Sequence, residues 1–492
     1  MLIWLILVPV IAAALIGLLK FPGRLTAIIS ASITLLLGVW AVLSPAECAD
    51  CLSTLGNTPL QFTLALPLSR MMVLLTVLVT FAAVVGMRAP SKDAERSWAI
   101  SALLLSTGAT GAFMSDNIIA FYGFHELALI PTFVMIGYYG RGDRRSIAWT
   151  ATIYLGLASM VLLAGLLMLC AEMHAWTFTD MVNSVRNGIL PANPCLIAGL
   201  LLAGFGTLVS LFPFHTWAAP AYASAPTPIA MLHAGVLKKF GLYGLFTLAA
   251  VFGPHCGMLF GGWNNLLLIL LLGNVLWVGY VTVSQTRLDD MLGNSSVMHM
   301  GYIFLAFAAY IAANGNNELA FQGAALLMLA HGLTIALLFL LNGQVESQTR
   351  TLEMDAMGGL GSKLPALGFL FGLAGLASIG LPLLANFAGE FTIFVSCFSG
   401  WSPAEVCGEC CCLTSLANFF GGLGPVQIAT LFALWGLVIS AIYMLRAFRR
   451  VFEGDIGHTS QRATKLSALD ITAAAFLAFF IVLFGILPPT WL

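Results

Sequence analysis

Charged side chains are scarce in this sequence. Asp, Glu, Lys and Arg make up 8% of the 492 residues, hydrophobic residues make up 60%, and the mean hydropathy is +0.97. Soluble domains carry about 25% charged residues, so this composition excludes a soluble protein. The formal net charge of −1 also lacks the basic excess that nucleic-acid binding requires. The composition therefore predicts a polytopic membrane protein whose surroundings are the lipid bilayer.

Apolar stretches run through the whole sequence, separated by short polar segments. A helix needs about 20 apolar residues to cross a bilayer, which leaves room for about 14 spans. Because lipid offers the backbone no hydrogen bonds, such spans are helical, and we predict an all-α fold. The predicted spans lie near residues 3–19, 25–44, 70–88, 97–113, 118–138, 146–170, 195–222, 227–253, 258–284, 291–312, 318–342, 365–400, 424–446 and 468–490.

The basic residues are distributed unevenly between alternate loops. Of the 20 Lys and Arg residues, 16 follow odd-numbered spans, Arg70 and Arg186 lie on the opposite side, and Lys238 and Lys239 fall within a span. Loops rich in Lys and Arg stay in the cytoplasm. The pattern therefore predicts that both termini face outside.

The ten cysteines include two clusters. Their spacing is compatible with zinc or an iron–sulfur cluster. The predicted topology puts both clusters outside, where oxidising conditions favour disulfides or free thiols over metal ligands. We therefore expect no metal site. The clusters consist of Cys48 and Cys51, and of Cys407, Cys410, Cys411 and Cys412.

Prolines break two of the predicted spans. Pro213 interrupts the segment 195–222, and Pro382 interrupts the segment 365–400. The two breaks lie five spans apart, so repeats containing them would be inverted relative to each other, as in many ion transporters. We expect two inverted five-helix repeats, each forming a half-channel. The predicted organisation is N-terminal helices at 1–113, whose fourth helix opens the first repeat, a first repeat at 97–253, a second at 258–446, and a last helix at 468–490.

Nine ionisable residues fall inside the predicted spans. Each costs about 2.5–3.5 kcal/mol in lipid, so such residues persist mainly where they serve a pathway. Carboxylates stand at both ends of the set, with lysines and histidines between them. Such groups can pass protons because each one's proton affinity depends on its neighbour's charge. The set is His125, Glu126, His215, His233, Lys238, Lys239, His299, His331 and Glu390.

Some of these residues also have a purely structural interpretation. A lone intramembrane histidine, such as His125 or His233, can be a simple hydrogen-bonded contact between helices. Consecutive residues are roughly 100° apart on a helix, so Lys238 and Lys239 cannot both face one pathway. Outside the spans, Asp289 and Asp290 are expected in a solvated cytoplasmic turn.

Six motifs follow one another between about residues 118 and 395: FHELALIPTF, PFHTW, SAPTPIAMLHAGVLKKFGLYG, SSVMHMGY, LAHGL and NFAGEF. Together they resemble the M-type antiporter-like membrane subunit of respiratory complex I, the counterpart of mitochondrial subunit four. The same superfamily includes Mrp-type cation/proton antiporters and membrane-bound hydrogenase subunits. FHELALIP, the histidine of SSVMHMG and the predicted end at the fourteenth span indicate the M branch.

The resemblance implies roles for the intramembrane residues. Glu126 would be the carboxylate at one end of the half-channel, and Glu390 the carboxylate near the exit. Lys239, the second lysine of VLKKFG, would be the connecting lysine. The histidines of the central axis would be His215, His299 and His331, and the auxiliary candidates are Lys238, His125 and His233.

The function that the resemblance implies is proton translocation from cytoplasm to outside along a Glu-Lys-His-Glu axis. The chain would be a non-redox subunit of an NADH:quinone oxidoreductase in a bacterial plasma membrane, beside L-type and N-type antiporter-like subunits. It would bind no cofactor, because NADH, flavin, iron–sulfur clusters and quinone would belong to partner subunits. The alternatives are a subunit of a cation/proton antiporter or of a membrane-bound hydrogenase, and a scaffold subunit that has lost pumping.

The sequence departs from the family pattern at three places, one of which is the turn after the ninth predicted span, where RLDD replaces the usual acidic residue followed by Lys-Arg. Leu208 stands where the family usually has a lysine, so Glu126 lacks its usual cationic partner, and Lys238 or His125 would have to replace it. Tyr222 stands in place of a second family histidine. Its hydroxyl can form hydrogen bonds but does not titrate near neutral pH.

Overall fold

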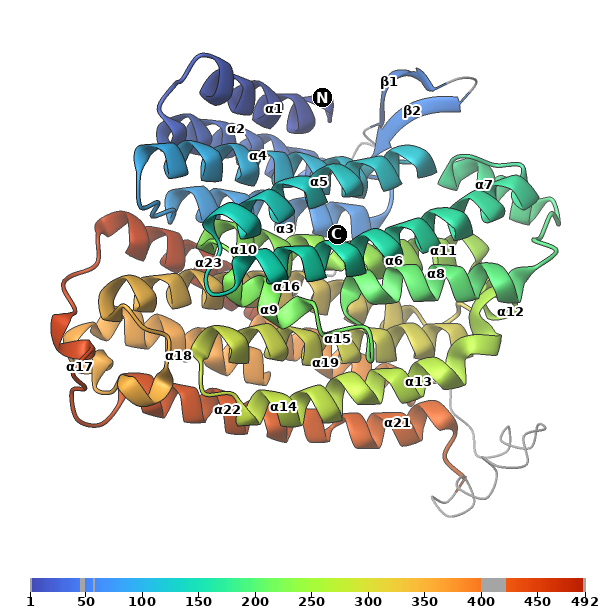
Figure 1. The fold of residues 1–492 in the computed structure, drawn as a ribbon. Helices are drawn as coiled ribbons and strands as arrows, with labels where there is room; N and C mark the ends of the chain where they lie inside the picture. The colour runs from blue at the N-terminus through green and yellow to red at the C-terminus, as the bar shows by residue number, and fades with distance from the viewer. Residues whose placement is uncertain (1, 45–48, 56–57, 400–421, 490–492) are drawn as a thin grey trace.

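Helices account for nearly all of the described chain. The computed structural model describes residues 2–44, 49–55, 58–399 and 422–489 (Figure 1). Within these residues ten helices are long and apolar enough to cross a membrane, and one of them, Thr227–Ser284, is a continuous run of 58 residues. That run is long enough for two spans. The structure thus confirms a polytopic helical membrane protein, while the number of fourteen spans stays a prediction.

The long helices run side by side, horizontally in Figure 1, so that the loops gather at two ends. In the first half of the chain the elements are α1 (Ile3–Leu18), α2 (Gly23–Leu43), β1 (Ala49–Leu55), β2 (Thr58–Thr63), α3 (Pro67–Val85), α4 (Lys92–Met114), α5 (Ile118–Tyr139), α6 (Arg144–Met173), α7 (Phe178–Arg186), α8 (Pro194–Val209), α9 (Ala218–Ser224), α10 (Thr227–Leu232), η1 (His233–Leu237) and α11 (Lys239–Phe252).

The second half of the chain surrounds the long helix α16, whose most apolar stretch is completely buried. Helices α15, α19, α23, α18 and α3 all pack against it. The elements are η2 (Gly253–His255), α12 (Cys256–Phe260), η3 (Gly261–Trp263), α13 (Asn264–Leu272), η4 (Gly273–Val278), α14 (Gly279–Ser284), α15 (Leu288–Ala312), α16 (Glu318–Thr349), η5 (Met354–Ala356), α17 (Leu360–Lys363), α18 (Pro365–Ile379), α19 (Ala385–Ser396), α21 (Pro425–Ala433), α22 (Trp435–Phe452), η7 (Ser460–Arg462) and α23 (Ala468–Ile486).

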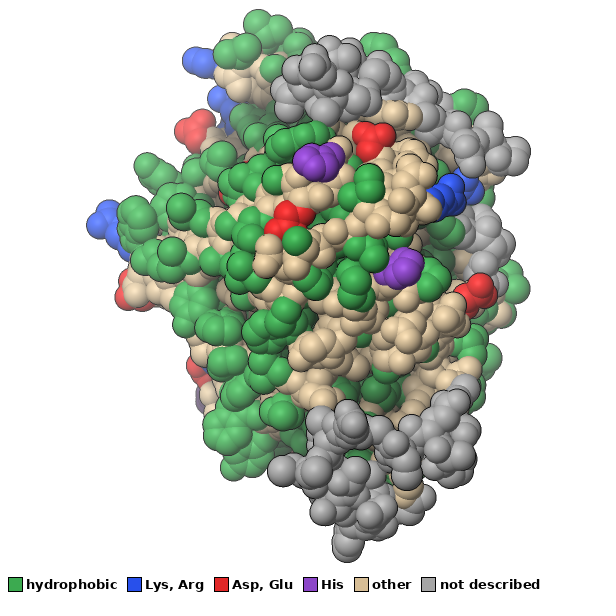
Figure 2. Space-filling model, turned by 90° about the vertical axis from the view of Figure 1, so that its right-hand side faces the viewer, with side chains coloured by type: hydrophobic (Ala, Val, Ile, Leu, Met, Phe, Trp, Pro, Cys, Tyr) green, Lys and Arg blue, Asp and Glu red, His purple; other side chains and the backbone are tan. Residues whose placement is uncertain are grey.

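The two ends of the bundle differ in charge. The connections α1–α2, α3–α4 and α22–α23 lie at the left of Figure 1, and the β-hairpin, α7 and α12 lie at the right. Figure 2 looks onto the right-hand end and shows few Lys or Arg side chains there. The left-hand loops are those in which the sequence concentrates its basic residues, and we call this the basic end. That it faces the cytoplasm stays a prediction.

A small antiparallel hairpin, β1–β2, occupies a segment that the sequence analysis treated only as a loop. Its second strand leads to the α4–α5 connection, where the amide of Asp116 donates to the Gln61 carbonyl at 3.0 Å. The Asp116 carboxylate in turn accepts hydrogen bonds from the amide and the hydroxyl of Thr179, at 3.1 and 3.0 Å. Asp116 thereby joins the hairpin to α7. Cys48 and the cluster Cys407–Cys412 lie outside the described residues.

Asp116→Asn is expected to raise stability at neutral pH. Burial raises the pKa of Asp116 above its ordinary value of 3.8. Wild-type stability should therefore fall as the pH rises through the pKa of the folded state, because the buried carboxylate then ionises. Asparagine keeps the oxygen that accepts both bonds from Thr179 but carries no charge. Thermal unfolding in detergent between about pH 3.5 and 7.5 should show the variant a few degrees more stable at the upper end only. An equal or larger gain at the acidic end would contradict this.

Both predicted helix breaks are present. Helix α8 ends at Val209 and α9 begins at Ala218, whereas α18 ends at Ile379 and α19 begins at Ala385. Freed backbone groups at membrane depth need partners inside the protein. At the first break Asn274 supplies them: its side chain accepts from the Phe212 amide at 2.7 Å and donates to the carbonyls of Ser210 and Val297.

The expected solvation of Asp289 was wrong. Its side chain is only 1% exposed, and its Oδ2 lies 2.9 Å from Nη2 of Arg287. The same guanidinium lies 3.4 Å from carboxylate oxygens of Asp290 and Glu353. The ion pairs of Arg287 with these three carboxylates hold the α14–α15 turn against η5, and this packing buries Asp289.

Candidate functional site

The most continuous polar contact in the membrane interior joins Lys238, in the turn between η1 and α11, to α16 through α15. Nζ of Lys238 donates to Oγ of Ser296 at 3.3 Å, and the same hydroxyl lies 3.2 Å from Nε2 of His331. All three side chains are buried, none being more than 2% exposed. The Lys238 amine also faces the Tyr222 ring, with Nζ 5.3 Å from the ring centroid. Lysine and histidine are therefore linked through a single hydroxyl.

His299 continues this cluster. Its ring stacks on His331 with the centroids 5.2 Å apart. Its Nδ1 lies 2.8 Å from the Ser295 carbonyl, and its Nε2 lies 2.9 Å from the Ser378 carbonyl. Carbonyl oxygens only accept hydrogen bonds, and an imidazole donates from both nitrogens only when it is protonated. The arrangement is therefore complete when His299 is an imidazolium, and it can hold a proton.

Glu390 is the carboxyl group beside His299. Its Oε1 lies 4.0 Å from Nε2 of His299 and has no hydrogen-bond partner within the protein. Glycine at position 380 makes this approach possible. Its φ is +83°, and a Cβ there would lie 2.2 Å from Oε2 of Glu390. The second helix break thus places its backbone directly against the buried carboxylate.

A second polar group lies around Glu126 on α5. Ser159 of α6 donates its one hydroxyl hydrogen to this carboxylate, and its oxygen lies 3.2 Å from the Tyr122 hydroxyl, from which it can accept. Nδ1 of His125 lies 3.5 Å from Oε1 of Glu126. The Glu126 side chain is 35% exposed and borders a groove of about 200 Å³ between α5 and α6. Of the two candidates for its cationic partner, His125 is the one beside it.

The two lysines point to different partners, in agreement with their predicted separation. Lys239 donates to the Ala234 carbonyl at 2.8 Å, within the π-helical turn η1 that precedes it. Such turns often mark functional sites. The next residue, Phe240, stacks on His125 with the centroids 3.9 Å apart. Lys239 is therefore held by the backbone of η1, whereas Lys238 reaches Ser296 on α15.

The remaining predicted residues border this interior. His233 lies between Trp217 and Tyr222, with ring centroids 5.7 and 5.2 Å away. His215 lies in the first helix break, half-buried and stacked on Phe212. Leu208, in place of the family lysine, is buried among apolar side chains. Neither histidine belongs to the Lys238–Ser296–His331 chain.

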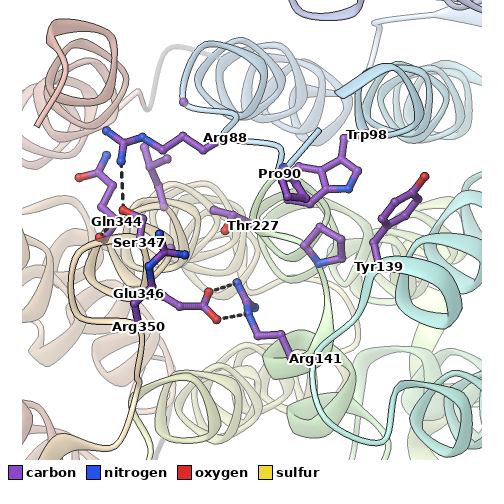
Figure 3. Close-up of a pocket in the computed structure, with 14 residues that line it drawn as sticks. Arg88, Pro90, Trp98, Tyr139, Arg141, Thr227, Gln344, Glu346, Ser347 and Arg350 are labelled. Atoms are coloured by element: carbon purple, nitrogen blue, oxygen red, sulfur yellow. Dashed lines mark hydrogen bonds and ion pairs between the residues drawn. The ribbon is translucent and has the colours of Figure 1, made fainter. Parts of the chain in front are cut away.

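A polar cavity of about 510 Å³ opens at the basic end (Figure 3). Arg141 pairs with both carboxylate oxygens of Glu346, at 2.8 and 2.5 Å, and Arg88 donates to Ser347 at 3.0 Å. The cavity reaches Thr227 at the start of α10, the helix that leads to η1. Its lining residues are Gly86, Arg88, Pro90, Trp98, Tyr139, Arg141, Pro226, Thr227, Leu340, Gly343, Gln344, Glu346, Ser347 and Arg350.

The structure therefore brings Lys238, His331, His299 and Glu390 together and leaves the Glu126 group apart. Among the described residues no hydrogen bond or ion pair joins the two groups, and no group of three or more His, Cys, Asp or Glu could hold a metal ion. Sequence reasoning missed Ser296. The available signal was its place three residues before His299, which puts both on one face of a helix.

The sequence is similar to membrane subunits of quinone oxidoreductases. The family described as "NADH:quinone oxidoreductase/Mrp antiporter, TM" matches residues 115–408. NADH-quinone oxidoreductase subunit M of Rickettsia prowazekii is 28% identical over 418 residues, which are 85% of this chain and 78% of that protein. NAD(P)H-quinone oxidoreductase chain 4 2 of Microcystis aeruginosa is 32% identical over 355 residues, 72% of this chain. The match spans 59% of the length of that cyanobacterial relative.

Solved structures show the same fold. A chain of respiratory complex I from Thermus thermophilus superimposes with a TM-score of 0.84 at 23% identity, covering 99% of this chain and 96% of the other. A chain of the archaeal membrane-bound sulfane sulfur reductase gives a TM-score of 0.83 at 21% identity, covering 98% and 75%.

Proposed function

Because this chain belongs to the NADH:quinone oxidoreductase/Mrp antiporter transmembrane family, we propose that it translocates protons as a non-redox, membrane-arm subunit of an NADH:quinone oxidoreductase. The observation that carries the proposal is the buried contact from Lys238 through Ser296 to His331, beside His299 and Glu390. Buried charges persist in membranes where they form proton relays. The similarity to subunit M relatives over most of the chain favours this branch of the family.

The proposal includes the finer architecture: fourteen spans and two inverted repeats, 97–253 and 258–446, each with one broken helix. The N-terminal helices and the last helix would flank them. Neighbouring subunits would be antiporter-like chains of the L and N types in a bacterial plasma membrane, with both termini outside. Flavin, iron–sulfur clusters, NADH and quinone would be bound by partners.

Protons would enter through the cavity at the basic end. Thr227 on its wall lies six residues before His233, about 9 Å along the helix. Water in the cavity could bring protons close to η1 and the two lysines. Lys239 would connect this cluster to the Glu126 group, and Lys238 would pass protons to His331 and on toward His299 and Glu390. Redox events in partner subunits would change the proton affinities in sequence.

Glu126→Gln and Lys239→Ala test this function in the assembled complex. Each is expected to lower the number of protons pumped per NADH oxidised, since a group that must change charge can no longer do so. Stoichiometry would be measured from acidification outside sealed vesicles. Glu172→Gln and Lys363→Ala are the controls, because Glu172 is partly exposed in the last turn of α6 and Lys363 is exposed at the end of α17. Unchanged stoichiometry in both test variants would leave a scaffold role as the better explanation.

A cation/proton antiporter subunit is the second candidate, since the family includes Mrp antiporters. Purification of the tagged chain from its native membrane separates the two. Co-purification of NADH-oxidising activity is the expected result. Isolation only with other membrane subunits, together with sodium-dependent proton exchange in vesicles, would support the antiporter instead.

A further inference from the structure

The Ser296 hydroxyl lies between the amine of Lys238 and the imidazole of His331. It lies 3.3 Å from the ammonium nitrogen and 3.2 Å from the imidazole nitrogen. The side chain is 0% exposed. The neighbouring Ser295 hydroxyl points elsewhere, toward Tyr443 OH at 2.7 Å. One serine of the pair bridges two titratable groups, whereas the other makes a structural contact.

The hydrogens at this contact can be assigned from its chemistry. The lysine ammonium can only donate, so the Ser296 oxygen accepts from it. The hydroxyl then has one hydrogen to give, and Nε2 of a neutral His331 can accept it. A hydroxyl that accepts on one side and donates on the other is the smallest complete proton relay. The unpartnered Nδ1 of His331 carries the hydrogen of that tautomer.

We propose that Ser296 is a catalytic relay residue that transfers protons between Lys238 and His331, a role that rests on the proton-translocating function proposed above. An N–H bond of the Lys238 ammonium breaks as a new O–H bond forms at Ser296. The original O–H bond of Ser296 breaks as an N–H bond forms at Nε2 of His331. The products are a neutral amine, an unchanged hydroxyl and an imidazolium. One positive charge has moved from Lys238 to His331 on α16 without any change of oxidation state.

The relay has a built-in order. After a transfer the serine hydrogen points back at Lys238, so the hydroxyl must rotate before it can donate to His331 again. It can do so only once Nε2 of His331 carries no hydrogen, because an Nε2–H otherwise donates to the same oxygen. The imidazolium therefore has to release its proton from Nδ1 and then return to the Nδ1–H tautomer. Each transfer therefore waits for discharge toward His299 and Glu390. The two halves of the chain are thereby coupled at one side chain.

Ser296→Val and Ser296→Thr form a matched pair for testing this relay. The valine and threonine side chains have nearly the same shape and therefore disturb the packing to a similar extent, but only threonine retains a hydroxyl. In the assembled complex, Val is expected to slow proton transfer on the order of 10²-fold and so lower the protons pumped per NADH. The Thr variant is expected to keep pumping protons, and its pumping rate is expected to decrease in D₂O. Ser295→Val is the control for loss of a buried hydroxyl in the same turn.

The outcomes separate the relay from the function on which it rests. Equal pumping by the Val and Thr variants, with Glu390→Gln impaired, would overturn the relay and leave the proton-translocating function standing. Normal pumping in Glu390→Gln and in both Ser296 variants would overturn both. Assembly is checked in every variant through NADH oxidation by a soluble electron acceptor. If Val prevents assembly but Thr does not, Ser296→Ala is measured, and pumping at the wild-type level in Ala would overturn the relay.

Discussion

Replacing Glu390 by glutamine is expected to stop proton output through this chain. Glutamine preserves the size of the side chain and its contact with Gly380 but cannot take up or release a proton. His299 would lose the only carboxylate within 4.0 Å recorded among the described residues. Loss of a positioned proton-transfer group costs about 10²–10⁴-fold in rate, which would make this route slower than turnover. The measurement is the number of protons pumped per NADH in sealed vesicles.

Glu318→Gln is the control for that experiment. Glu318 begins α16 and is exposed, so its replacement changes the net charge equally without entering the buried cluster. Wild-type stoichiometry in Glu390→Gln would contradict the role assigned to this carboxylate. A loss of equal size in both variants would indicate an effect of net charge.

The second large effect is expected on stability, from Arg88→Ala. Arg88 forms a two-point ion pair with Asp470, whose side chain is 1% exposed, and also donates to Ser347. Asp470 is part of the capping box of α23 with Ser467. Removing one partner of a fully buried ion pair costs about 3–5 kcal/mol, because the other charge stays buried. The Arg88 side chain is 34% exposed, so a smaller cost of about 1–3 kcal/mol is expected. Thermal unfolding of the detergent-solubilised chain should show a clearly lowered midpoint.

Arg96→Ala supplies the comparison. Arg96 pairs with Asp93 at 3.7 Å, and the Asp93 side chain is 91% exposed. Exposed pairs contribute about 0–1 kcal/mol, so the unfolding midpoint should change little. Similar destabilisation by both substitutions would mean that burial of Asp470 does not control the strength of the Arg88 pair.

Helix positions were largely predictable because they follow from hydropathy. The apolar runs and the prolines at 213 and 382 specify where helices form and break, since lipid leaves the backbone no other partner. The hairpin β1–β2 was not predicted. Its strands depend on pairing between Ala49–Leu55 and Thr58–Thr63 and on contacts with the α4–α5 connection, which no local pattern reveals.

The candidate site was predictable by residue type but not by arrangement. Every ionisable group within the spans could be found from its cost in lipid. The partners could not: His125, not Lys238, lies beside Glu126, and Lys238, not Lys239, contacts Ser296. Which neighbour each of the two consecutive lysines meets depends on the rotation of the helix at that point. The π-helical segment η1, directly before Lys238, changes this rotation.

The sequence by itself determined that this chain is a helical membrane protein with a set of costly charges in its interior, because each of those properties depends on residues taken one at a time. Only the tertiary structure decided which charges meet. Ser296 is an ordinary helix residue in the sequence, and it becomes the link between Lys238 and His331 only where α11, α15 and α16 pack together. The direction of a side chain depends on the rotation of its helix against its neighbours, and that rotation is set by packing across the whole bundle.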